Sequence, residues 1–319
     1  MKTQTTSSMS NAEQRDLANN RSQSERNQIM KQMTMFARRV CLVGAFFVGV
    51  FAFALLATSP DAIAFTFTTI DVPGATGTGA GRSNAQGQIV GGYTDASGAG
   101  HGFLLDDGDF TVIDVPGATS TGAVGITAAG QIVGIYVDAG GTEHGFLLDQ
   151  GTFTTIDPPG SDFTQAFDIN ARGQIVGDYR DASGTYHGFL LDKGIFTTID
   201  PPGSVFTQAV GLNARGQIVG DFEAPRHHGF LLDKGTFVTI DFPGAYATDA
   251  LGINAAGQIV GRYYDGFTQH GFLLDKGIFT TIDPPGSTYT EAIGINAAGQ
   301  IVGDYLDASG TQHGFLATP

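Results

Sequence analysis

The sequence repeats at a period of about 43 residues, and the period occurs six times between Phe65 and the C-terminus. Each copy carries three short elements in the same order: a segment that starts with Phe and ends in Ile-Asp, then Gly-Gln-Ile-Val-Gly, then His-Gly-Phe. A fixed period of this length is typical of one supersecondary unit repeated in a stack or around a ring. The histidines of the last element are His101, His144, His187, His228, His270 and His313.

Within one copy, residues 166–203, the pattern predicts four short strands separated by turns. Gly173 and Gly194 stand where tight turns need a positive φ, and Asp181 begins the turn between them. No stretch has helical spacing, so the unit is predicted to be a four-stranded antiparallel meander. The expected strands are residues 166–170, 174–179, 187–192 and 195–200.

These strands carry apolar residues on both faces, so each sheet needs a neighbouring sheet on either side. Six such units packed face to face describe an all-β fold, a six-bladed β-propeller. The repeat begins with a fourth-type strand at 65–71 and ends with a third-type strand at 313–316. We therefore expect the N-terminal strand to complete the C-terminal blade, which closes the ring and removes its exposed edge. An open solenoid would instead need capping units, and none is visible in the sequence.

Charge and cysteine content narrow the range of partners. From residue 65 on, the chain has 27 acidic and nine basic residues. Such a surface repels nucleic acid and anionic membranes, so we expect neither as a partner. The single cysteine, Cys41, precedes the repeats. We therefore expect no disulfide framework and no thiolate metal site in the propeller.

Residues 1–64 form a separate N-terminal region. Residues 1–36 are polar and predicted to be disordered. Arg38 and Arg39 then precede an apolar core at 40–57 and the sequence Ala62-Ile63-Ala64, a pattern that predicts a secretory signal peptide cleaved after Ala64. Cleavage would release residues 65–319 as a secreted monomer, extracellular or periplasmic, without a membrane segment. The alternatives are an uncleaved membrane anchor and a later start at Met30, Met33 or Met35.

The recurring Ala-x-Gly-Ile-Asn, Gly-Gln-Ile-Val-Gly and His-Gly-Phe elements resemble the HAF-repeat family of extracellular bacterial proteins. That family's signature is His-Ala-Phe, and Gly replaces the Ala at all six sites of this chain. The resemblance covers the whole repeat region, and it implies export and a repeat fold. It implies no activity, no catalytic residues and no cofactor.

The repeated polar residues are expected to serve the scaffold. Equivalent residues of different blades are related by rotation, so the six histidines cannot meet at one metal ion. We expect each to be a buried, hydrogen-bonded histidine. The Asp that ends each fourth strand is expected to cap the Pro-Gly turn after it. No catalytic motif, metal site or cofactor is predicted, and the Asp-x-x-Gly turns lack the alternating acidic ligands of a calcium loop.

Departures from the repeat are the places where a function could be added. The first departure lies on the innermost strands, where four units carry Gly and the other two carry Arg82 and Asp168. These strands line the centre of the predicted ring. The two charged residues could therefore bind a ligand at the mouth of the channel, or they could plug the channel as a structural ion pair.

The second departure lies on the loop face, by which we mean the end of the ring that carries the loops before the first strands and those between the second and third strands. The fourth unit has a short second loop with Glu223, Arg226 and His227, the only histidine outside the repeated motif. Exposed aromatic groups beside polar groups suit a glycan or a peptide, whereas the same aromatics could pack between blades. The aromatics before the first strands of units three to six are Phe163, Phe206, Tyr246 and Tyr289.

The sequence therefore predicts a secreted binding or structural module whose partner is a glycan, a peptide or a cell-surface protein. The alternative is a hydrolase or lyase with its site at the channel mouth, around Arg82, Asp168 and His227. Six-bladed propellers host both classes, so the fold does not choose between them. The choice depends on whether these side chains converge on one pocket or are engaged by the scaffold.

Overall fold

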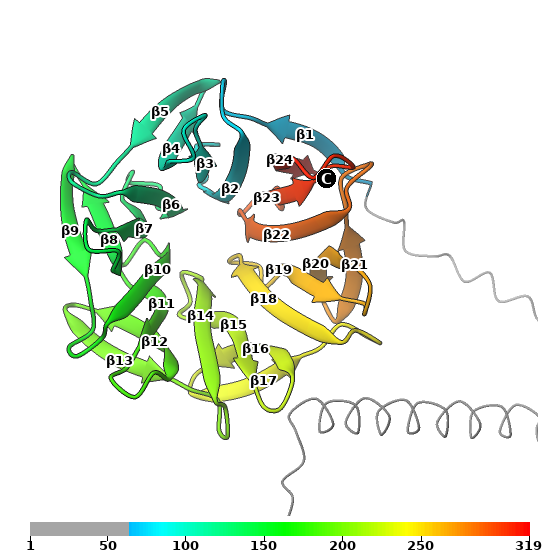
Figure 1. Ribbon diagram of the computed structural model, residues 1–319. Coiled ribbons are helices and arrows are strands. Elements are labelled where there is room, and N and C mark those ends of the chain that lie inside the picture. Colours follow the sequence, from blue (N-terminus) through cyan, green and yellow to red (C-terminus); the bar gives the residue numbers. More distant parts are fainter. Residues whose placement is uncertain (1–63) are drawn as a thin grey trace, which may run out of the picture. The chain divides into compact units, whose positions relative to one another are not determined.

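The computed structural model describes residues 64–319, which form six four-stranded antiparallel sheets arranged in a ring (Figure 1). This is the predicted six-bladed β-propeller. Across residues 64–319, no helix has the length and apolarity that a membrane crossing would require. The predicted disordered region, the apolar core at 40–57 and the alternative starts lie outside the described residues.

Each blade runs from an inner strand at the centre of the ring to an outer strand at its rim. The inner strands of blades 1 to 6 are β2 (Gly77–Ser83), β6 (Ser120–Ile126), β10 (Phe163–Ile169), β14 (Phe206–Leu212), β18 (Ala247–Ile253) and β22 (Tyr289–Ile295). The second strands are β3 (Ile89–Thr94), β7 (Ile132–Val137), β11 (Ile175–Arg180), β15 (Ile218–Glu223), β19 (Ile259–Tyr264) and β23 (Ile301–Leu306). The third strands are β4 (Gly100–Asp106), β8 (Glu143–Asp149), β12 (Tyr186–Asp192), β16 (His227–Asp233), β20 (Gln269–Asp275) and β24 (Gln312–Thr318). The outer strands are β5 (Asp109–Ile113), β9 (Thr152–Ile156), β13 (Ile195–Ile199), β17 (Thr236–Ile240), β21 (Ile278–Ile282) and, in blade 6, β1 (Thr66–Ile70).

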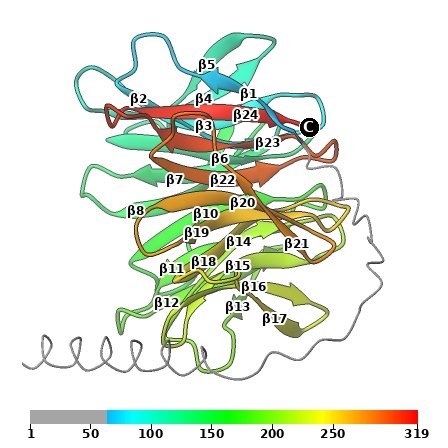
Figure 2. The same ribbon diagram turned by 90° about the vertical axis from the view of Figure 1, so that its right-hand side faces the viewer.

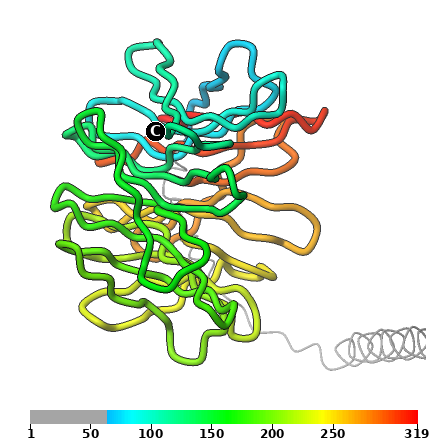
Figure 3. The backbone as a smooth tube through the Cα atoms, turned by 60° about the vertical axis from the view of Figure 1, so that its left-hand side comes forward, coloured from blue at the N-terminus to red at the C-terminus, as the bar shows by residue number. Residues whose placement is uncertain are grey.

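The two ends of the repeat region close the ring as predicted. Strand β1 pairs antiparallel with β24, with Thr66 opposite Thr318 and Ile70 opposite Gly314. The blue first strand and the red last strand lie side by side (Figures 1 and 3). His313 Nδ1 lies 2.9 Å from Asp71 Oδ1, so a side-chain contact joins the same two segments. Closure gives blade 6 its outer strand, so β24 is paired on both sides and does not form an exposed sheet edge.

The core lies between the blades, and two elements of the repeat build it together. The Phe of each His-Gly-Phe is fully buried, and it lies opposite the last Gly of Gly-Gln-Ile-Val-Gly, as Phe189 does with Gly177. A Cβ on Gly177 would lie 2.7 Å from the Phe189 ring. The glycine therefore makes room for the aromatic side chain, whose burial stabilises the fold by about 1.5–3 kcal/mol per ring.

The glycine inside His-Gly-Phe sets the distance between neighbouring blades. A Cβ on Gly188 would lie 2.9 Å from the carbonyl oxygen of Ile199 and 3.2 Å from the Cβ of Ala209 on the next blade. A larger residue would push the two sheets apart. This close approach favours Gly at position 188.

The inner strands begin earlier than the sequence pattern predicts, and each contains a β-bulge. In blade 3 the strand starts at Phe163, and its pairing shifts between Ala166 and Asp168. Phe163, Phe206 and Tyr289 are therefore first residues of inner strands, not loop residues, and only Tyr246 precedes its strand. A bulge re-aims the residues around it. Here, bulge-residue carbonyls of blades 3 to 6 meet one side chain at the centre of the ring.

The repeated histidines are hydrogen-bonded as expected, but they are half-buried, not buried. His187 is representative: its Nδ1 lies 2.8 Å from Asp200 Oδ2, its Nε2 lies 3.5 Å from Asp181 Oδ2, and its ring packs on Tyr179 at 5.3 Å. In all six blades, the Asp after the outer strand bonds this histidine. The predicted role of these aspartates as turn caps is therefore wrong, because the third and outer strands place the two side chains against each other.

Candidate functional site

Arg82 and Asp168 meet at the centre of the ring and are buried there. Arg82 Nε lies 3.2 Å from Asp168 Oδ1, and the two side chains are only 8% and 10% exposed. The Arg82 guanidinium also donates to four backbone carbonyls of other blades: Nη2 to Val210 at 2.7 Å and Leu251 at 2.8 Å, Nη1 to Ile293 at 3.0 Å, and Nε to Phe167 at 3.4 Å. One side chain thus neutralises carbonyl dipoles that point toward the axis.

The Asp168 carboxylate is equally engaged. Its Oδ2 accepts the Leu212 amide of the next blade at 3.0 Å, and its Oδ1 accepts the Ile169 amide at 2.9 Å. Burial raises the pKa of Asp168, while the charge of Arg82 and the two amides oppose that rise. The pair is therefore bound by the scaffold. It offers no free group to a substrate, which weakens the hydrolase or lyase alternative at the channel mouth.

The loop face is where the blades differ most. Phe163 pairs with Arg180 at the end of the second strand, and Arg180 pairs with Tyr186 at the start of the third strand, so both kinds of loop share one end of the ring. The strands run between this face and the opposite one (Figure 2). Just inside the loop face, blades 3 to 6 carry polar residues at two positions that face each other across the inner and second strands. We call this set the polar ring: Gln165 and Asp178, Gln208 and Asp221, Asp249 and Arg262, and Glu291 and Asp304.

Side chains of the polar ring connect neighbouring blades. Gln208 Nε2 of blade 4 donates to Asp178 Oδ2 of blade 3 at 3.1 Å. Arg262 of blade 5 pairs with Asp249 at 2.6 Å and also contacts Glu291 of blade 6. Just inside the loop face, the polar ring therefore fills the space between blades 3 to 6 with charged and amide groups, whereas the rest of the space between the blades is apolar.

Burial shifts the protonation of several of these carboxyls. It raises the pKa of Asp178 to about 7 and that of Asp304 to about 7. It raises the pKa of Asp221 to about 6, against the opposing effect of His227. Carboxyls that titrate near neutral pH are typical of functional sites, although structural networks also produce them.

Three of the residues predicted for ligand binding are brought together by a residue that the sequence analysis missed. Tyr186 lies 5.4 Å from the ring of Phe163 and 5.6 Å from that of Phe206, and Phe206 lies 5.8 Å from His227. Arg180 lies 5.8 Å from the ring centres of both Phe163 and Tyr186. The rings of Phe163, Tyr186 and Phe206 are half-buried between blades 3 and 4, so they serve packing as well as offering an edge to the solvent, whereas His227 is exposed.

The other predicted residues lie apart from this row. Tyr246 is 66% exposed and touches Tyr264 at a ring distance of 6.2 Å. Tyr289 donates a hydrogen bond from its hydroxyl to Glu291 of the polar ring. Glu223 is half-buried opposite Phe206, and Arg226 is exposed in the short loop between β15 and β16.

A concavity of the loop face lies where the predicted aromatics are missing. A cavity of about 390 Å³ lies over blades 1 and 2, and Gln312 of blade 6 closes one side of it. Its floor is made by Gly79, Gly92 and Gly122, and no side-chain atom fills the space beside Gly122. The polar residues of its lining are Tyr93, Thr94, His101, Ser120, Thr121, Tyr136, Glu143 and Gln312.

This cavity forms because blades 1 and 2 lack the polar ring. The facing positions are Gly79 and Gly92 in blade 1, and Gly122 and Ile135 in blade 2. The sequence contains the signal, since the positions of Gln165 and Asp178 hold glycine in blade 1. Departures from the repeat that add a side chain do not reveal a cavity of this kind, which forms where side chains are missing.

Comparison with known proteins supports the fold alone. No family model matches the chain, and no curated protein matches it. Among solved structures, AofleA from Arthrobotrys oligospora matches with a TM-score of 0.52 at 12% identity, over 82% of this chain and 88% of that one. TolB from Acinetobacter baumannii matches with a TM-score of 0.51 at 13% identity, over 72% of this chain and 63% of that one. A lectin from Aleuria aurantia, in complex with Fucα1-6GlcNAc, has a TM-score of 0.49 at 14% identity, over 76% of this chain and 91% of the lectin.

Proposed function

We propose that this chain is a binding module that holds a short neutral saccharide in the cavity over blades 1 and 2. Its export is part of the proposal and is supported by the resemblance to HAF-repeat proteins and by the signal-peptide pattern before residue 65. The observation that carries the proposal is the cavity itself. It is about 390 Å³ in volume, within the range of small-ligand sites. It exists only where the polar ring is interrupted, so it is a local departure from an otherwise filled face.

The chemistry of the wall favours a polyhydroxyl ligand. Ser120 and Gln312 can donate and accept hydrogen bonds, and Glu143 can accept them, which matches sugar hydroxyls. Among residues 64–319, no lysine or arginine lines the cavity, so an anionic ligand would meet no fixed cation. A neutral sugar needs no cation in its site.

A variant that fills the cavity tests this proposal. Gly122 has no atom within 4 Å of an added Cβ, so Gly122→Gln places in blade 2 the side chain that Gln165 contributes to blade 3. We expect the full chain to bind saccharides on a glycan array and Gly122→Gln to lose at least tenfold in affinity. Thr197→Gln adds the same side chain on the exposed outer strand β13 and should bind as the wild type does. Saccharide binding that survives Gly122→Gln would refute the site.

A peptide or surface protein would engage a different part of the loop face. Tyr246, Tyr264 and Phe267 are 66%, 38% and 93% exposed over blade 5. Binding to a peptide array that is lost in Tyr246→Ala and Phe267→Ala, and kept in Gly122→Gln, would place the partner on these aromatics instead. Phe206→Ala and Tyr289→Ala test two further predicted aromatics in the same assay.

A further inference from the structure

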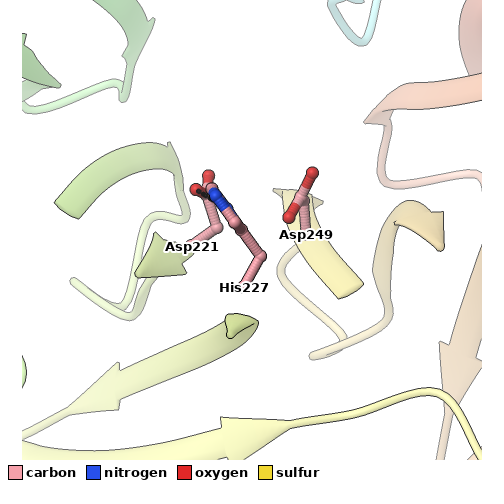
Figure 4. Close-up of side chains that lie close together, drawn as sticks. All are labelled: Asp221, His227 and Asp249. Atoms are coloured by element: carbon pink, nitrogen blue, oxygen red, sulfur yellow. Dashed lines mark ion pairs between the residues drawn. The ribbon is translucent and has the colours of Figure 1, made fainter. Parts of the chain in front are cut away.

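Three side chains that can ligate a metal ion lie together on the loop face, over blades 4 and 5. They are Asp221 in β15, His227 at the start of β16, and Asp249 in β18 of the next blade. One potential ligand atom from each lies within 4.8 Å of the other two. Figure 4 shows the imidazole and the two carboxylates facing one another across the gap between the blades.

The short loop of blade 4 brings His227 to this position. The loop contains only Ala224, Pro225 and Arg226, and His227 pairs with Glu223 at the end of the preceding strand. Its Nδ1 lies 3.7 Å from Asp221 Oδ2, one strand away. The next residue, His228, carries the repeated role, with its Nδ1 2.8 Å from Asp241. His227 is therefore an added histidine that the scaffold contact does not use.

The two carboxylates are buried and incompletely satisfied. Asp221 is 3% exposed and Asp249 is 8% exposed. Arg262 pairs with Asp249 Oδ2 at 2.6 Å, but Asp249 Oδ1 is buried and has no hydrogen-bond partner among the described residues. A buried carboxylate oxygen without a partner is costly unless a donor or a cation reaches it.

The local charge also favours a cation. Asp221, Asp249 and Glu291 carry three negative charges when ionised, and Arg262 supplies one positive charge. A divalent ion between the carboxylates of Asp221 and Asp249 would offset the repulsion between their negative charges.

We propose that Asp221, His227 and Asp249 bind one divalent transition-metal ion of the Zn²⁺ type. An imidazole nitrogen beside two carboxylate oxygens suits Zn²⁺ and its neighbours, whereas Ca²⁺ and Mg²⁺ prefer oxygen ligands alone. Three protein ligands leave a coordination position for water or for an external ligand. The site is independent of the saccharide cavity over blades 1 and 2, so either proposal can fail without the other.

Titration of the metal-free full chain tests the site. After treatment with EDTA and its removal, isothermal titration with ZnCl₂ should give one site per chain, and Co²⁺ should produce a visible ligand-field absorption. We expect His227→Gln and Asp249→Asn each to weaken Zn²⁺ binding at least tenfold. His228→Gln, which changes the neighbouring histidine of the same strand, should bind Zn²⁺ as the wild type does.

The side chain of His227 is 45% exposed, so His227→Gln is expected to fold even where Asp249→Asn does not. Zn²⁺ should raise the melting temperature of the wild type and of His228→Gln, and leave that of His227→Gln unchanged. Zn²⁺ binding that is equally strong in His227→Gln would refute the site, and so would Ca²⁺ binding with the same affinity as Zn²⁺. Either result would mean that cations bind the acidic surface in general. The absence of any stoichiometric binding would refute it as well.

Discussion

Arg82 of blade 1 and Asp168 of blade 3 form an ion pair at the centre of the ring, with Nε and Oδ1 3.2 Å apart. They occupy the positions at which the other four blades carry glycine. Because Arg82 also donates to carbonyls of blades 4, 5 and 6, one side chain contacts four of the other five blades. The two departures on the inner strands therefore act as a plug that ties the ring together.

Removal of this plug should destabilise the propeller. Arg82→Met would leave the Asp168 carboxylate buried without its partner and several inward carbonyls without donors. We expect the free energy of unfolding, measured with urea, to fall by about 3–5 kcal/mol. Arg172→Met, at an exposed arginine, should change it by no more than about 0.5 kcal/mol. A loss below about 1 kcal/mol in Arg82→Met would mean that water replaces the guanidinium at little cost.

The buried carboxyl of Asp178 should make stability depend on pH. Its folded-state pKa of about 7 lies above the ordinary value of 3.8, so the folded protein holds this proton more tightly than the unfolded chain does. That contribution is full below about pH 4 and is lost as pH rises through 7. Asp178→Asn removes the ionisation, so its stability relative to the wild type should rise between pH 4 and pH 8, by a few kcal/mol at most.

Urea unfolding at several pH values measures this difference. Asp109→Asn, at an exposed aspartate, is the control and should follow the wild type across the range. A constant offset between Asp178→Asn and the wild type at all pH values would show that the Asp178 carboxyl does not titrate in this range.

Substitution by alanine should affect stability very differently at two glycines of blade 2. A Cβ on Gly134 would overlap the Gly122 carbonyl and lie 2.8 Å from the Phe146 ring, whereas a Cβ on Gly122 would meet nothing within 4 Å. Gly134→Ala should therefore cost at least about 3 kcal/mol or prevent folding, as overpacking of a core does. Gly122→Ala should leave the melting temperature unchanged or slightly higher, since Gly weakens a strand interior. Similar melting temperatures for the two variants would contradict the packing described above.

The hairpin turns between third and outer strands contain a residue whose substitution should stabilise the fold. Lys193 has φ of 51° and is followed by Gly194 with φ of 80°, the arrangement of a type I′ turn. Asn tolerates the left-handed region better than Lys does, so Lys193→Asn should stabilise the fold by up to about 1 kcal/mol. Thr197→Asn, in the adjacent outer strand, should destabilise it instead. Thermal unfolding of both variants decides the matter, and a lower melting temperature for Lys193→Asn would contradict the assigned turn.

Several residues of the candidate site could be predicted from the sequence, but their arrangement in space could not. The aromatics and His227 are departures from the repeat; in the structure Tyr186 lies between Phe163 and Phe206, and Phe206 contacts His227. Asp221 was passed over because it belongs to Gly-Gln-Ile-Val-Gly-Asp, which looks like scaffold in three blades. Its role depends on Asp249, which comes from the next blade and becomes a neighbour only when the sheets pack.

The sequence by itself determined the architecture: the period, the strand and turn alternation, and the offset between its ends define a closed six-bladed ring. It could do so because strand pairing within a blade depends on local spacing, which is written in consecutive residues. Only the tertiary structure decided which polar residues meet. The ion pair of Arg82 with Asp168, the cavity beside Gly122 and the cluster around His227 all lie between blades. Their geometry depends on bulges and on the close approach of sheets, and no spacing along the chain specifies either.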